Sequence, residues 1–72
     1  MLMWEARAAD GRLDDLVAYV LGVTDPSAQV FRSAEPDPRV VVLDPTERGV
    51  GEVADELVAR PPHSWSFEPV PR

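Results

Sequence analysis

An unbroken apolar run, Val40–Leu43, lies between the charged residues Arg39 and Asp44, and a proline stands just outside each charge. A strand with one face in water alternates apolar and polar side chains, whereas this run offers no polar side chain to either face. The pattern therefore predicts a strand that is buried on both faces. A chain of 72 residues is too short to cover both faces of the sheet that contains this strand. We therefore expect another molecule to cover the second face.

Three further segments have the patterns of strands. Residues 2–8 alternate between an apolar face and a mixed face. Residues 28–34 alternate so weakly that the pattern does not determine which of their faces is turned to the core. The turn-forming residues 35–38 predict an antiparallel hairpin between 28–34 and 40–43. Residues 64–68 alternate again, and the prolines after them confine this fourth strand to an edge or end of the sheet.

Two segments have helical spacing. Between residues 13 and 21 the apolar positions recur every three or four residues, which predicts a helix. Asp10 is placed to cap its N-terminus, and Gly22 is placed to take the left-handed position at its C-terminus. Apolar residues recur in the same way between 50 and 58 until Pro61-Pro62, which predicts a second, shorter helix.

The resulting order is strand, helix, strand, strand, helix, strand. It predicts one α+β domain over residues 1–72 with the ferredoxin-like βαββαβ plan, a four-stranded antiparallel sheet with both helices on one face. In that plan the first and third strands lie in the middle. The open face would carry some of Met1, Met3, Val41 or Val42, and Phe31 or Val30. Because a monomer seldom exposes such a patch, we expect a homodimer that pairs through this face.

The topology resembles the dimeric α+β barrel superfamily, which includes the antibiotic-biosynthesis monooxygenases. The local likeness is Asp10-Gly11-Arg12-Leu13, which closes the first strand into the helix. The resemblance implies two subunits packed sheet against sheet, with a space between them for a small aromatic or polyketide-like ligand. The spacing of Gly11 and Leu13 also resembles the start of an ACT-type ligand-binding regulatory domain.

Composition narrows the possible partners. The net charge is −6, and the seven basic residues are all arginines spread from Arg7 to Arg72. Nucleic acids and anionic membranes require a concentrated basic face, so we expect neither as a partner. The chain has no cysteine, and no secretory or membrane segment is apparent, so we expect a cytoplasmic location. A single core of this size is thin, which again favours a second subunit.

Chemistry-bearing residues are few. Catalytic candidates are His63, Arg32 and Trp65, although a lone histidine beside two prolines more often has a structural role. We expect Trp4 and Trp65 to pack in the core, where they would meet beneath the helices if the first and fourth strands are neighbours. The charged strand residues, Glu5, Arg7, Arg32 and Glu68, are expected to form ion pairs. Nothing predicts a metal site, and Gly49-Val50-Gly51 lacks the remaining features of a phosphate-binding loop, so no cofactor is expected.

These observations leave three functional hypotheses. The leading one is a homodimeric protein that acts by interaction or by small-molecule binding. The second is a cofactor-independent monooxygenase or isomerase of the dimeric barrel type, with its substrate held between the sheets. The third is an ACT-like regulatory domain. The first two differ in whether apolar side chains fill the space between the sheets or leave a cavity edged by Arg32, Glu5 or Trp65.

Overall fold

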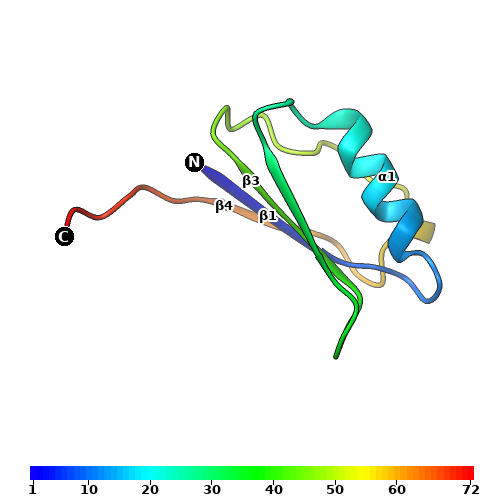
Figure 1. The fold of residues 1–72 in the computed structure, drawn as a ribbon. Coiled ribbons are helices and arrows are strands. Elements are labelled where there is room, and N and C mark those ends of the chain that lie inside the picture. Colours follow the sequence, from blue (N-terminus) through cyan, green and yellow to red (C-terminus); the bar gives the residue numbers. More distant parts are fainter.

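A four-stranded antiparallel sheet forms one layer of the protein, and a single α-helix lies across one of its faces (Figure 1). The structure is a computed structural model that describes residues 1–72. Its elements are β1 (Leu2–Arg7), α1 (Leu13–Val23), β2 (Gln29–Ser33), β3 (Arg39–Asp44), a 3-10 turn η1 (Asp55–Leu57) and β4 (His63–Ser66). At 11 residues, α1 is shorter than a bilayer-spanning helix needs to be.

The strand order is β2-β3-β1-β4, so β1 and β3 occupy the centre and β4 lies at an edge. These positions, and the antiparallel pairing of β2 with β3, confirm what the sequence predicted. In the central pair, Trp4 lies opposite Val42 and Ala6 opposite Val40. On the other side of β1, Met3 lies opposite Trp65 and Glu5 opposite His63.

The first helix forms where the spacing predicted it, but both of its caps were predicted wrongly. The N-cap residue is Arg12, without a side-chain capping bond, because Gly11 takes a positive φ and turns the chain after Asp10. At the other end the helix continues through Gly22 to Val23. Both the N–H and the hydroxyl of Thr24 then donate to the Val20 carbonyl, at 3.1 and 2.8 Å.

The predicted second helix does not form. Residues 49–54 have no regular secondary structure, and only the three residues of η1 turn in a helical sense. Gly49 and Gly51 have φ values of +73° and +76°, which an α-helix cannot contain. With two such bends at its start and Pro61-Pro62 at its end, the remaining segment is too short for a stable helix.

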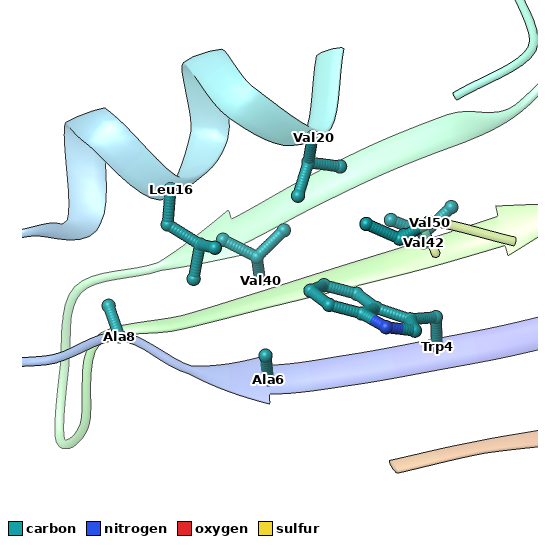
Figure 2. Packing of buried hydrophobic residues seen from close by; sticks show 8 residues of the cluster. All are labelled: Trp4, Ala6, Ala8, Leu16, Val20, Val40, Val42 and Val50. Atoms are coloured by element: carbon teal, nitrogen blue, oxygen red, sulfur yellow. The ribbon is translucent and has the colours of Figure 1, made fainter. Parts of the chain in front are cut away.

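The core lies between α1 and the sheet (Figure 2). Leu16 and Val20 point from α1 towards Val40 on β3, and Trp4 lies beside them on β1. The irregular segment after β3 completes the core through Val50, which is 6% exposed. Eight apolar side chains form the buried cluster: Trp4, Ala6, Ala8, Leu16, Val20, Val40, Val42 and Val50. So small a core agrees with the expectation drawn from chain length.

The two faces of the sheet differ sharply in burial. On β3, Val40 and Val42 are fully buried beneath α1, whereas Val41 and Leu43 on the other face are partly exposed. Within one chain the run is therefore buried on one face only. The expectation that both tryptophans meet in the core was wrong, because Trp4 is buried on the helix side and Trp65 is 45% exposed on the open side. Neighbouring strands place them on opposite faces, since Trp65 pairs with Met3 and not with Trp4.

Candidate functional site

A cavity of about 550 Å³ opens on the helix side of the sheet, between the β1–β4 pair and the chain that follows β3. Leu2, Trp4 and Ser64 form its floor. Residues 48–53 form its wall, and Asp55 and Pro62 lie at one end. The predicted second helix would have covered this part of the sheet. Because an irregular segment takes its place, the strands beneath are less completely covered and the cavity remains.

A buried carboxylate holds the start of the cavity wall. Asp44, at the end of β3, accepts hydrogen bonds from the Thr46 N–H and hydroxyl at 2.9 and 2.7 Å, and from the Gly49 N–H at 2.8 Å. Burial by itself would raise the pKa of Asp44, but these hydrogen bonds outweigh it and hold the pKa below its ordinary value. Asp44 is therefore an ionised, fully buried anchor for the loop.

A second contact fixes the middle of the wall. The Tyr19 hydroxyl, on α1, donates a hydrogen bond to the Glu52 carbonyl. The N–H groups of residues 50–53 donate no backbone hydrogen bond, so side-chain contacts position this stretch. The wall is thus tied at Gly49 to β3 and at Glu52 to α1.

The charges around the cavity are predominantly negative. Arg48 lies at its mouth with 77% of its side chain exposed, and its guanidinium is 3.8 Å from the Asp25 carboxylate. Two hydrogen bonds from Ser27 are the main cause of a lowered pKa at Asp25, with Arg48 adding to the effect. Glu52 and Asp55 also line the cavity, and neither makes an ion pair. The cavity therefore offers two uncompensated carboxylates.

The open face of the sheet carries the second candidate surface. Its centre is apolar, with Met3, Phe31, Val41, Leu43 and Trp65 brought together by the strand register. Phe31 is 49% exposed. Beyond the end of β4 the patch continues through Phe67, whose ring centroid lies 5.7 Å from that of Trp65 at an interplanar angle of 58°.

One end of the open face is charged. Arg7 and Arg39 lie directly opposite each other on β1 and β3. Asp37 approaches both, with its Oδ1 2.8 Å from Arg7 and its Oδ2 3.8 Å from Arg39. The buried Arg39 Nε lies 3.1 Å from a Glu5 carboxylate oxygen without the geometry of a hydrogen bond. Of the expected ion pairs, that of Glu5 with Arg39 joins two strands, and that of Arg7 joins β1 to Asp37 in the turn between β2 and β3.

The three candidate catalytic residues do not converge. His63 and Trp65 share the open face of β4, where His63 lies opposite Glu5. Arg32 belongs to the other face, because its guanidinium pairs with Asp14 of α1 at 3.2 Å. Arg32 therefore cannot line a cavity between two open sheet faces, and that prediction was wrong. Glu68 lies beyond β4, outside the sheet.

The cavity was not predicted from the sequence. Its wall was interpreted as a helix, and its floor as ordinary strand positions. The signals that could have found it are Gly49 and Gly51, two residues apart, and the Asp-x-Thr pattern of Asp44 and Thr46, which is typical of a turn stabilised by a side chain.

Comparison with known proteins gave no similarity: no family model, no curated protein and no solved structure matches the chain.

Proposed function

We propose that this protein acts by binding, as a homodimer whose subunits pack through the open faces of their sheets. The observation that carries this proposal is the apolar centre of that face. Phe31 and Trp65 are each nearly half exposed there, on either side of the partly exposed Val41 and Met3. A second copy laid against the face removes these side chains from water, and each fully buried large apolar side chain contributes about 1.5–3 kcal/mol.

The charge of the face favours a second copy as its occupant. Each chain carries a net charge of −6, which opposes self-association. At the charged end of the face, however, Glu5 and Asp37 balance Arg7 and Arg39, and their contacts neutralise them within one subunit. Two copies can therefore meet apolar centre to apolar centre without burying an unpaired charge.

The size of the face predicts a dimer of modest affinity. Four strands about 4.8 Å apart and about six residues long give a flat area on the order of 400 Å² per subunit. Two such faces bury about 800 Å², which is below the roughly 1,200–2,000 Å² of stable specific interfaces and belongs to weak, transient association. We therefore expect association in the micromolar range.

The proposal also includes a ferredoxin-like fold for each subunit. The strand order, the crossing of α1 over one face and the edge position of β4 support the ferredoxin-like plan, with its second helix replaced by an irregular segment and the short turn η1. Pairing through the open face would then give the assembly of the dimeric α+β barrel superfamily in a reduced form.

Sedimentation velocity across the micromolar range tests the dimer. The wild-type chain should shift from a 7.9 kDa species towards twice that mass with rising concentration. Val41→Glu, which places a charge at the centre of the face, should remain monomeric. Leu21→Glu is the matched control, because Leu21 is an exposed apolar residue of α1 on the other side of the molecule. Wild-type protein that stays monomeric throughout, or Val41→Glu that dimerises normally, would refute the proposal.

One observation favours a second candidate, a cofactor-independent monooxygenase or isomerase. The register places His63 opposite Glu5 and beside Trp65 on the face that a partner would enclose, so a base, an acid and an aromatic ring share it. A crystal structure of the dimer separates the two candidates. An enclosed cavity lined by His63 and Glu5 would favour the enzyme, and a seam filled by Met3, Val41 and Phe31 would exclude it.

A further inference from the structure

The cavity between β1, β4 and residues 48–55 has the features of a built ligand site. At about 550 Å³ it lies within the range of small-molecule pockets. It lies on the helix side of the sheet, opposite the proposed dimer face, so it stays available whether or not the protein dimerises.

An unpartnered donor lies at the floor of this cavity. Trp4 is 4% exposed and lines the cavity, and no side chain or backbone group accepts a hydrogen bond from its indole N–H. Among residues that are not exposed, Arg39 Nε is the only fully buried side-chain nitrogen without a hydrogen-bond partner. The indole nitrogen therefore keeps some accessible surface, and the cavity is the open space that Trp4 lines. In Figure 2 the benzene ring of Trp4 lies nearest Val40, and the nitrogen lies on the far edge of the indole. A donor held in this way is satisfied by an acceptor that enters the cavity.

The rim of the cavity carries negatively charged hydrogen-bond acceptors, in contrast to the donor at its floor. Glu52 and Asp55 carry the carboxylates without ion-pair partners described above. The one lining cation, Arg48, is largely exposed, and its guanidinium lies 3.8 Å from the carboxylate of Asp25, which does not line the cavity. A cationic group at the rim would gain charge-assisted hydrogen bonds from carboxylates that now face water alone. The excess negative charge of the whole chain also draws cations towards the cavity.

Between floor and rim, apolar side chains form one part of a mixed lining. Leu2 lies beside Trp4 on β1, Val53 belongs to the wall and Pro62 closes one end. A ligand that spans the cavity therefore needs an apolar body with an acceptor at one end and a cation at the other.

We propose that this cavity binds a small aromatic amine, whose ammonium group pairs with Glu52 and Asp55 and whose distal oxygen accepts the hydrogen bond of the Trp4 indole. The wall is suited to hold such a ligand, because the Asp44–Gly49 and Tyr19–Glu52 bonds fix it at two points. Binding then requires little ordering of the protein, which lowers its entropic cost.

Nitrogen-15 NMR titration of the whole chain tests the proposal directly. The two indole N–H signals are assigned with Trp65→Phe, and the Trp65 signal then serves as an internal control on the opposite face. Tyramine should shift the Trp4 indole signal saturably and leave that of Trp65 unchanged. Tyrosol, which replaces the ammonium by a hydroxyl, and 4-hydroxyphenylacetate, which replaces it by a carboxylate, should each bind at least about tenfold more weakly, a factor that corresponds to about 1.4 kcal/mol.

Substitutions in the protein test the same contacts as the changes in the ligand. Glu52→Gln combined with Asp55→Asn should weaken tyramine binding at least about tenfold, while Glu56→Gln, a neighbouring exposed carboxylate that does not line the cavity, should leave it unchanged. Phenethylamine, which lacks the phenol oxygen, should bind more weakly than tyramine and produce a smaller shift at Trp4. The proposal fails if tyramine gives no saturable shift at Trp4, if the anion binds as tightly as the amine, or if the double variant keeps full affinity.

Discussion

The Asp44 carboxylate accepts a hydrogen bond of 2.8 Å from the Gly49 N–H and thereby fixes the chain that leaves β3. This contact determines where residues 50–53 run, because Val50 enters the core directly after Gly49. The cavity wall thus depends on one buried charge. Without the contact, we expect the loop to lose its register on the sheet.

Asp44→Ala should therefore destabilise the fold by about 2–3 kcal/mol, because it removes hydrogen bonds to an ionised acceptor and leaves their donors without a partner. Urea unfolding followed by circular dichroism measures this loss. Asp10→Ala is the control, since Asp10 is an exposed residue whose side chain makes no hydrogen bond or ion pair. If the two variants prove equally stable, the anchoring role of Asp44 is wrong.

Acid should act on the same residue. Hydrogen bonds from Thr46 and Gly49 overcome the effect of burial and lower the pKa of Asp44 in the folded state. A group whose pKa is lower when folded stabilises the protein above its unfolded pKa, about 3.9 for aspartate, and this stability is lost as the pH falls further. Unfolding free energies measured between about pH 6 and pH 2 should therefore fall more steeply for the wild type than for Asp44→Asn. Parallel curves for the two proteins would contradict the prediction.

The glycines of the wall make a matched pair. Gly49 and Gly51 both have φ near +75°, so alanine at either position is strained, by about 1–2 kcal/mol. At Gly49 an added Cβ would also lie 2.8 Å from Leu2 Cδ2, whereas at Gly51 it would meet nothing within 4 Å. Gly49→Ala should consequently lower the free energy of unfolding more than Gly51→Ala does. If both variants lose the same free energy of unfolding, the Leu2 side chain moves away from the added Cβ without an energetic cost, and the prediction is wrong.

The central strand illustrates how far the sequence alone predicts this fold. The strand at Val40–Leu43 and the helix over residues 13–21 were predicted correctly, because β-branched residues favour a strand and the helical spacing extends over more than two turns. Burial of the strand on its second face stays a prediction. The segment 50–58 was misinterpreted because its apolar spacing is also helical. In this segment the positive φ values of Gly49 and Gly51 prevent the helix that the apolar spacing predicts.

The candidate site was harder to predict for a physical reason. The side chains of a strand alternate between the faces, so a one-residue difference in register decides which face Trp4, Trp65 and Arg32 occupy. The alternation within one segment does not determine how that segment aligns with its neighbour. The cavity depends further on Asp44, whose hydrogen-bond partners follow from the path of the loop and not from the pattern of the strand.

Gly22 offers a stabilising substitution. It lies within α1 with an ordinary φ, and an added Cβ would meet nothing within 4 Å. Because alanine is the better helix former, Gly22→Ala should raise the free energy of unfolding by about 0.5–1 kcal/mol. Ala18→Gly, at an exposed position of the same helix, should lower it by a similar amount. Chemical denaturation of both variants checks the prediction, and a destabilised Gly22→Ala would contradict it.

The charged end of the open face allows a test of how like charges are held together. Arg7 and Arg39 lie directly opposite each other, an arrangement that is unfavourable unless a counter-charge stands between them. Asp37 fills that role, although all three side chains are about 40% exposed and the gain is correspondingly small. Asp37→Ala should cost about 1 kcal/mol. Adding Arg7→Gln should then restore part of this loss by removing one of the two facing cations, whereas Arg7→Gln alone should destabilise. A double-mutant cycle by urea unfolding measures this coupling, and strictly additive effects would show that Asp37 does not bridge the pair.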